Sequence, residues 1–264
     1  MRSNINYVKD EMRELRAKKK YGQNFLIDEN ICDKIAKIAC DNNLPIIEIG
    51  PGLGALSEKL ILYSNRVDAY EIDEDMYNIL KNNLEADNFN LYLSDFLDVD
   101  LSKYNEKINI CGNLPYYVTT PILFKIFEAD LDINKITVMV QKEVADRINA
   151  KVGSEDYGSL SLEIQYLFDV KYEMDVSRNV FYPKPNVDSS VISFISKGTR
   201  YDDKLFELIK NCFRMRRKTL HNNLKDIYDE DTISRLYKEL DLKENVRAQE
   251  LDLDIFIKMN EMLG

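Results

Sequence analysis

Three features in the first half of the chain have the residue types and spacing of a nucleotide-binding site. The glycine-rich string 50–54 (G-P-G-L-G) follows a short apolar run, and glycines between a strand and a helix let the backbone approach a ligand closely. Glu71 lies about 20 residues further on, where a carboxylate can accept hydrogen bonds from both ribose hydroxyls. Asp95 follows the next apolar run and can accept from an adenine amine. Their joint spacing favours a binding site over ordinary strand-end caps.

The pattern of the glycines distinguishes between two cofactors. It is not the G-x-G-x-x-G of dinucleotide binders, and the sequence has neither a pyrophosphate cradle nor a hydride acceptor site that would suit NAD. S-adenosylmethionine needs only room for its methionine tail beside the turn. We therefore predict S-adenosylmethionine as the cofactor, with contacts from Gly50, Gly52, Glu71 and Asp95.

The loop 113–116 (N-L-P-Y) follows the fourth apolar run and fits amine chemistry. The lone pair of adenine N6 is delocalised into the ring, so N6 is a poor nucleophile until acceptors draw it out of conjugation. The Asn113 side-chain oxygen and the Leu114 carbonyl, held rigid by Pro115, would bind both N6 hydrogens and direct the lone pair at a sulfonium methyl. Tyr116 would stack on the flipped base, a contact worth about 1 to 3 kcal/mol. The alternative is a proline turn with a packed tyrosine.

Taken together, the motifs resemble those of the ribosomal RNA small-subunit adenine dimethyltransferase family, through nearly the whole chain. The resemblance is carried by residues 22–26, 48–52, 71–73, Asp95, 112–116, 181–189 and 216–220. It implies a Rossmann-like, seven-stranded methyltransferase sheet with a small C-terminal all-helical domain. The implied activity transfers two methyls to each of two adjacent adenosines near the RNA 3′ end.

The resemblance also implies roles for single residues. By position, cofactor contacts fall on Asn24, Leu26, Gly50, Glu71, Asp95 and Asn113. Phe181 would form the second aromatic face against the target base, alongside the catalytic loop. One departure is Tyr117, where many relatives carry Asn, and it would alter the pocket wall without changing the reaction.

Two basic clusters stand out in a chain of formal net charge −10. They are Arg13, Arg16 and 18–20 near the start, and Arg214 and 216–218 near the end. The acidic net charge argues against an RNA partner, because phosphate binding is driven by Lys and Arg that displace counterions. Alone, each basic cluster is more often a solvated helix face than a nucleic-acid patch. With the resemblance, we expect Arg216, Arg217 and Lys218 to contact RNA phosphates. The expected partner is small-subunit rRNA, within an assembling 30S-type particle, bound by a monomer.

Several function classes are excluded. The single histidine, His221, leaves no room for triad hydrolases or His-rich metal sites, so no metal is expected. Four cysteines without a C-x-x-C pair indicate reduced, mostly buried thiols. Since no apolar run reaches the length that crosses a bilayer, and the N-terminus lacks a signal-peptide core, we expect a cytoplasmic protein without membrane contact.

Three alternative functions share part of this pattern. Macrolide-resistance methylases modify large-subunit rRNA with the same cofactor and loop, but 216–220 and 247–251 resemble the small-subunit family. DNA adenine methyltransferases usually carry Asp or Asn before Pro-Pro-Tyr, and Leu114 differs. A mainly non-catalytic ribosome assembly factor is disfavoured by the retention of Glu71, Asp95 and Asn113.

The elements that must position these residues alternate between strand and helix, which predicts a parallel, doubly wound α/β sheet. Strands are expected at 45–49, 67–72, 90–93, 107–111 and 136–141, and helices at 28–41, 73–84 and 120–129. The β-like runs 170–176 and 187–195 would add an antiparallel edge. From about Tyr201 onward the periodicity is helical. We expect a catalytic, cofactor-binding domain with a basic arm at 1–197 and a helical, RNA-contacting domain at 198–264.

Overall fold

The computed structural model describes residues 5–14, 24–115, 118–129 and 131–264. By its internal contacts the chain divides into two compact units. The first comprises Met1–Ala145 and Val170–Gly198, and the second comprises Asp146–Asp169 and Thr199–Gly264.

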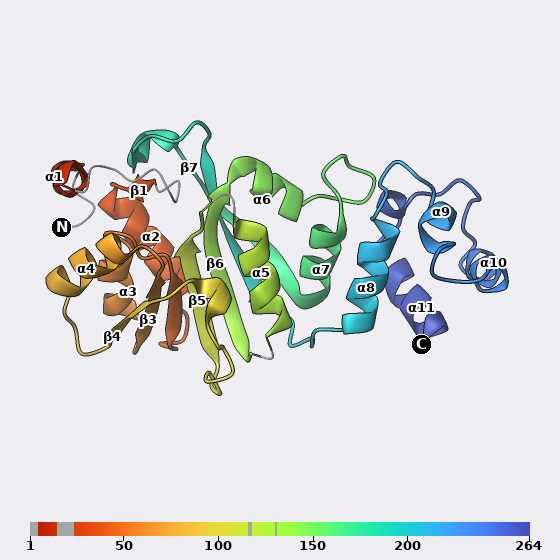
Figure 1. Ribbon diagram of the computed structural model, residues 1–264, viewed down its shortest axis with the longest axis horizontal. Coiled ribbons are helices and arrows are strands. Elements are labelled where there is room, and N and C mark those ends of the chain that lie inside the picture. The colour runs from red at the N-terminus through yellow and green to blue at the C-terminus, as the bar shows by residue number, and fades with distance from the viewer. Residues whose placement is uncertain (1–4, 15–23, 116–117, 130) are drawn as a thin grey trace. The chain divides into compact units, whose positions relative to one another are not determined.

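A seven-stranded sheet forms the centre of the first unit, in the order β4-β3-β2-β5-β6-β9-β7 (Figure 1). The strands are β2 (Ile46–Ile49), β3 (Val67–Glu71), β4 (Phe89–Leu93), β5 (Ile108–Asn113), β6 (Ile133–Gln141), β7 (Phe168–Val176) and β9 (Ser189–Ser196). The pairs from β4 to β6 are parallel, and β9 runs antiparallel to β6. The predicted Rossmann-like α/β fold is confirmed, including its antiparallel strand.

Helices follow the strands as the alternating pattern predicts. They are α2 (Glu29–Ala39), α3 (Ser57–Tyr63), α4 (Glu74–Asn83), α5 (Thr119–Glu128) and α6 (Lys142–Ile148), preceded by α1 (Ile5–Glu14). Asp28 caps α2 by accepting from two backbone N–H groups, and Asp73 caps α4 in the same way. Because caps of this kind fix where a helix begins, both helices start within two residues of their expected positions.

A short two-stranded sheet lies beside the glycine turn. Its strands are β1 (Phe25–Leu26) and β8 (Phe181–Tyr182), which pair antiparallel although they are far apart in the sequence. Phe25 packs with Val8 of α1, Leu53 and Met76 in one apolar cluster. The glycine turn is therefore covered by the segment that precedes α2.

The second unit is built from helices. They are α7 (Ser159–Leu167), α8 (Asp203–Cys212), α9 (Leu220–Leu224), α10 (Glu230–Glu239) and α11 (Leu253–Leu263). The domain division expected from the sequence placed 146–169 with the sheet, whereas α7 packs on α8 and α11. Nearly every side of α7 is buried, so it lacks the amphipathic periodicity by which a helix is recognised in a sequence. The expected boundary at 197/198 lies beside Gly198, where the first unit ends.

Candidate cofactor and catalytic site

The glycine turn follows β2 at the carboxyl end of the sheet, where open α/β sheets bind ligands. Gly50 and Gly52 have φ of +68° and +55°, in the left-handed region that favours glycine. A Cβ at Gly50 would meet no atom within 4 Å, whereas one at Gly52 would lie 3.1 Å from the Phe25 ring. The backbone at Gly50 thus borders open space that a ligand can enter.

Glu71, the last residue of β3, joins the glycine turn through its side chain. One carboxylate oxygen accepts from the Gly52 N–H at 2.8 Å, and the other accepts from the Asp73 N–H at 2.9 Å. Burial raises the pKa of Glu71, although these backbone hydrogen bonds oppose the rise. A carboxylate has about four lone-pair sites, so it can also accept from ligand hydroxyls.

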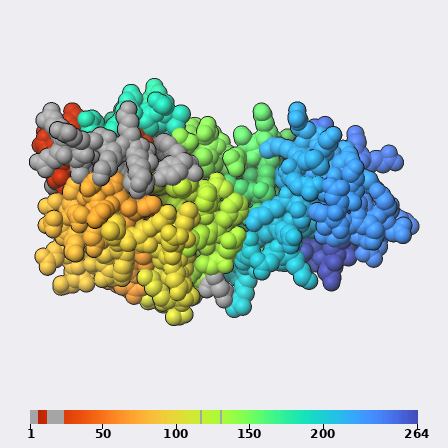
Figure 2. All heavy atoms as spheres, viewed as in Figure 1, coloured from red at the N-terminus to blue at the C-terminus, as the bar shows by residue number. Residues whose placement is uncertain are grey.

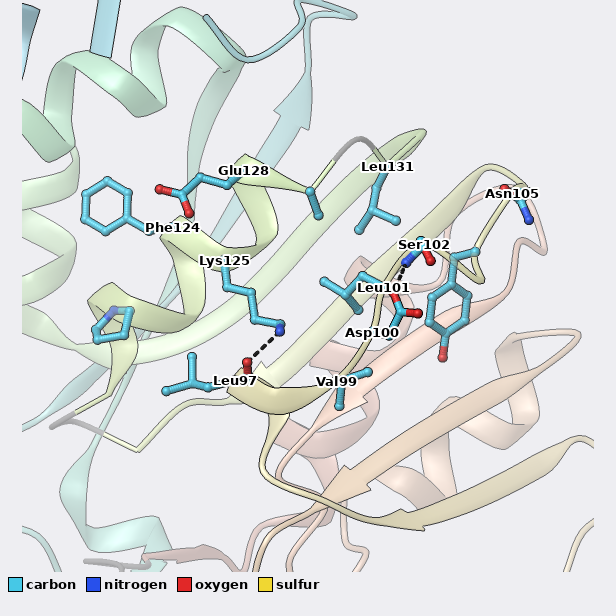
Figure 3. Close-up of a pocket in the computed structure, with 13 residues that line it drawn as sticks. Leu97, Val99, Asp100, Leu101, Ser102, Asn105, Phe124, Lys125, Glu128 and Leu131 are labelled. Carbon is cyan, nitrogen blue, oxygen red and sulfur yellow. Dashed lines mark hydrogen bonds between the residues drawn. The ribbon is translucent and has the colours of Figure 1, made fainter. Parts of the chain in front are cut away.

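Asp95 lies next to Glu71, because the Ser94 N–H donates to the Glu71 carbonyl at 2.8 Å. Its own carboxylate caps the short helix η2 (Phe96–Asp98) by accepting from the Leu97 N–H at 2.9 Å. On the other side of this turn, the Lys125 ammonium of α5 donates to the Leu97 carbonyl at 2.6 Å, beside a surface pocket (Figure 3). The turn carrying Asp95 is therefore held from two sides. In the space-filling view, the segment around 95–105 and α5 lie side by side on the surface (Figure 2).

Asn113 ends β5, which pairs directly with β2. A Cβ at the preceding Gly112 would lie 2.7 Å from the Ile49 carbonyl oxygen, so this pairing requires glycine. The Asn113 amide nitrogen donates to the Asn24 carbonyl at 3.2 Å. Its oxygen, on the other branch of the amide, has no hydrogen-bond donor among the residues that the structure describes. An unoccupied acceptor of this kind is what the predicted amine chemistry requires.

The next two residues, Leu114 and Pro115, are held by hydrogen bonds to their backbones. Leu114 is buried and its N–H donates to the Met139 carbonyl of β6 at 3.1 Å. The Pro115 carbonyl accepts from the Val118 N–H and the Thr119 hydroxyl, both at 3.1 Å. Tyr116 and Tyr117 lie outside the described residues.

Phe181 is brought to this region by β8, where it pairs with Leu26 of β1. Both side chains are buried in one apolar cluster, and Phe181 is only 3% exposed. The pairing places Leu26 beside Phe181, and the hydrogen bond from Asn113 joins Asn24 to the end of β5. The buried ring does not present an open face, so its stacking on a base stays a prediction from the resemblance.

The second basic cluster lies in the second unit, in the turn between α8 and α9. Arg216, Arg217 and Lys218 are all exposed. The Arg216 guanidinium donates to the carbonyls of Ser154 and Glu155, so part of it is used within the unit. Arg217 and Lys218 are therefore the more available of the three for phosphate. The side chains of the cluster at 13–20 lie outside the described residues.

One feature of the site was not predicted from the sequence. Glu48, on β2, is 1% exposed and accepts a hydrogen bond from the Ser57 hydroxyl at 2.6 Å. Burial raises the pKa of Glu48 to about 8, opposed by that hydrogen bond. The sequence signal that could have indicated this residue is an acid inside the otherwise apolar run 45–49.

Further observations concern thiols, metals and membranes. All four cysteines are free, and Cys32, Cys111 and Cys212 are buried as expected. Within the described residues, no cluster of three or more His, Cys, Asp or Glu side chains could hold a metal ion. The described helices are too short or too polar for any of them to span a membrane.

The sheet order, the antiparallel β9 and the acids at the ends of β3 and β4 together define a Rossmann-like methyltransferase. A family profile described as "Ribosomal RNA adenine dimethylase" matches residues 14–263. The chain belongs to this family.

Curated relatives and a solved structure agree with this assignment. The "Ribosomal RNA small subunit methyltransferase A" of Mycoplasmopsis pulmonis is 46% identical over 246 residues, covering 92% of this chain and 97% of the relative. The protein of the same name from Mycoplasma mobile is 43% identical over 242 residues, covering 90% and 95%. A dimethyladenosine transferase from Plasmodium falciparum superposes with a TM-score of 0.77 at 26% identity, covering 89% of this chain and 95% of the other.

Proposed function

We propose that this protein transfers methyl groups from S-adenosylmethionine to N6 of two adjacent adenosines near the 3′ end of small-subunit rRNA, two to each, during small-subunit biogenesis. The observation that carries the chemistry is the Asn113 amide. Its nitrogen is bound to the Asn24 carbonyl, which orients its oxygen as a hydrogen-bond acceptor beside the glycine turn. The relatives' names, at 43–46% identity, support the small subunit over the large one.

The residues present fit S-adenosylmethionine. Gly50 offers open space for the methionine tail, Glu71 has lone pairs left for ribose hydroxyls, and Asp95 can accept from the adenine amine. Asn24, whose carbonyl accepts from the Asn113 amide, and Leu26, which pairs with Phe181, would complete the contacts. When bound, the cofactor supplies a methyl group on an electron-poor sulfonium sulfur.

The protein's own contribution is to bind and orient the amine. The Asn113 oxygen and the Leu114 carbonyl accept the two N6 hydrogens of an extruded adenine, which draws the nitrogen lone pair out of the ring. The hydrogen bonds of Leu114 and Pro115 keep both acceptors in place before the base arrives, so little reorganisation is needed. Tyr116 and Phe181 would hold the base by stacking, and the exposed Arg217 and Lys218, with Arg216, would bind RNA phosphates.

Methyl transfer to two kinds of particle tests the proposal. Methyl-labelled S-adenosylmethionine is offered with small or large ribosomal subunits that lack these methylations. We expect label in small-subunit RNA only, and no label with Asn113→Ala. Asn82→Ala, an exposed position of α4, is the matched control and should retain activity.

Label in large-subunit RNA would contradict the proposed substrate. Full particle maturation by Asn113→Ala, in cells where it transfers no methyl, would instead favour the assembly-factor alternative.

A further inference from the structure

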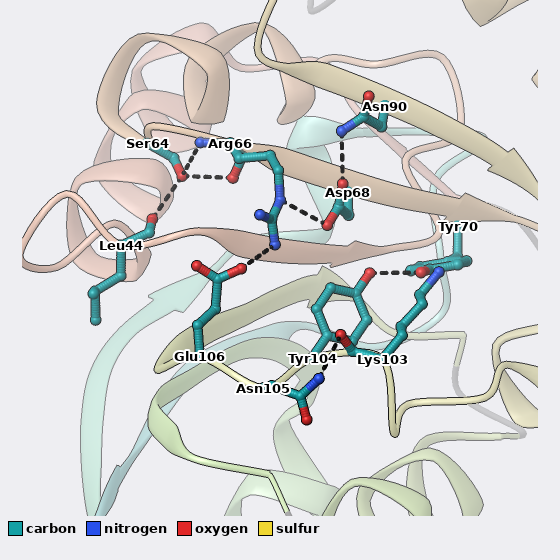
Figure 4. A network of polar contacts seen from close by, with 10 residues as sticks. All are labelled: Leu44, Ser64, Arg66, Asp68, Tyr70, Asn90, Lys103, Tyr104, Asn105 and Glu106. Carbon is teal, nitrogen blue, oxygen red and sulfur yellow. Dashed lines mark hydrogen bonds and ion pairs between the residues drawn. The ribbon is translucent and has the colours of Figure 1, made fainter.

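Three tyrosines from separate segments of the first unit form one cluster, and two of them, Tyr70 and Tyr104, are drawn in Figure 4. Tyr70 of β3 stacks on Tyr92 of β4, with ring centroids 5.0 Å apart and planes inclined by 18°. The hydroxyls of Tyr70 and Tyr104 are hydrogen-bonded at 2.6 Å. Tyr70 and Tyr104 are buried, so this contact is shielded from water. The cluster joins β3, β4 and the segment that precedes β5.

A single cation completes the cluster. The Lys103 ammonium lies 5.2, 4.7 and 5.3 Å from the ring centroids of Tyr70, Tyr92 and Tyr104. These distances are within the range of cation–π attraction. Burial alone would lower the pKa of Lys103, but Tyr70, Tyr92 and Asp68 raise it above its ordinary value. The ammonium of this exposed lysine is therefore charged and is attracted to all three rings.

Tyr70 is in contact with three parts of the cofactor site. Its carbonyl accepts from the Gly50 N–H at 2.9 Å, and the next residue along β3 is Glu71. Its ring also packs edge-on against Phe96, the neighbour of Asp95, with centroids 5.9 Å apart. A shift of Tyr70 would move the glycine turn, the ribose acceptor and the adenine acceptor relative to one another.

We infer that Tyr104 and Lys103 are positioning residues for cofactor binding. Acting through Tyr70, they fix the spacing between the β3 end that carries Glu71 and the β4 end that carries Asp95. The inference rests on the proposed function, since it takes those two acids as the adenosine contacts.

The same segment offers a matched control. Glu106 pairs with Arg66 at 2.7 Å, and Arg66 also pairs with Asp68 at 3.0 Å near the start of β3. This ion pair attaches the segment to β3 at the end remote from the glycine turn. We expect its loss to loosen this attachment while the Tyr70–Tyr104 hydrogen bond and the Lys103 contacts remain.

The test compares Tyr104→Phe, Lys103→Met, Lys103→Arg and Glu106→Gln by calorimetry with S-adenosylmethionine and S-adenosylhomocysteine. Tyr104→Phe removes one hydroxyl and keeps the ring, and Lys103→Met keeps the length of the chain without its charge. For these two variants we expect the Kd of both ligands to rise about three- to tenfold, with kcat at saturating cofactor within about twofold of wild type. Lys103→Arg and Glu106→Gln should bind like wild type.

Unchanged Kd in Tyr104→Phe and Lys103→Met, with normal wild-type binding, would overturn the inference and leave the proposed function intact. If Glu106→Gln weakens cofactor binding equally, the cluster only anchors the segment and the inference is overturned. The same conclusion follows if Tyr104→Phe and Lys103→Met lower kcat, cofactor affinity and melting temperature together. A wild-type protein that binds neither ligand would refute the proposed function itself.

Discussion

Alanine at Gly50 separates the strain of a positive φ from the loss of ligand space. Gly50 and Gly198 have nearly equal φ, +68° and +72°, and a Cβ at either would meet no atom within 4 Å. The left-handed conformation costs a non-glycine residue about 1–2 kcal/mol, and a stiffer unfolded chain returns about 0.4–1 kcal/mol. Both Gly50→Ala and Gly198→Ala should therefore lose about 1 kcal/mol of unfolding free energy.

Only the methyl at Gly50 enters the space proposed for the cofactor. An extra methyl in a filled site costs about 1–3 kcal/mol, which raises Kd about 5- to 150-fold. Urea unfolding measures the stability of both variants, and calorimetry with S-adenosylmethionine measures their affinity. Wild-type affinity in Gly50→Ala, or an equal loss in Gly198→Ala, would refute the reasoning.

Three further predictions follow from the same structure. Glu71→Ala removes the proposed ribose acceptor and should raise the Kd for S-adenosylmethionine at least about tenfold, because hydrogen bonds to charged groups contribute about 1.5–3 kcal/mol. A Kd equal to that of the wild type, measured by calorimetry, would rule that role out. In the folded protein the Glu48 carboxyl stays protonated up to its pKa of about 8, whereas in the unfolded chain it ionises near pH 4.5. The contribution of Glu48 to the unfolding free energy is therefore fully present below pH 4.5 and is lost as the pH rises toward 8. Between pH 5.5 and 7.5 the wild type should lose about 2–3 kcal/mol of unfolding free energy relative to Glu48→Gln. If the unfolding free energies of the two proteins change in parallel with pH, Glu48 is already ionised in the fold and the prediction is wrong. Arg217→Ala should weaken RNA binding at every salt concentration and lower the slope of log K against log salt by about one; an identical slope would remove Arg217 from the phosphate contacts.

Local patterns in the sequence were sufficient to predict most of the sheet and the acids at its carboxyl end. Glycines, strand-end carboxylates and helix caps act within a few residues of their position, so Asp28, Gly50 and Glu71 reveal their surroundings directly. The strand β9 was predictable because β-branched and aromatic residues recur through its run.

Features that depend on contacts between distant segments were not predictable. The helix α7 is buried on nearly all sides, its polar residues included, and shows no amphipathic period, so its packing with α8 and α11 was missed. The Tyr70–Tyr104 hydrogen bond joins residues 34 positions apart, and no local pattern indicates it. Phe181 is buried where it pairs with Leu26, and most of the first unit's sequence separates these two residues.

A crystal structure of the protein with S-adenosylhomocysteine tests the central claim most directly. We expect the ribose hydroxyls at Glu71, the adenine amine at Asp95, the amino-acid tail beside Gly50 and the Asn113 oxygen facing the sulfur. A ligand bound away from Gly50, or an Asn113 oxygen turned away from it into the protein, would contradict the account.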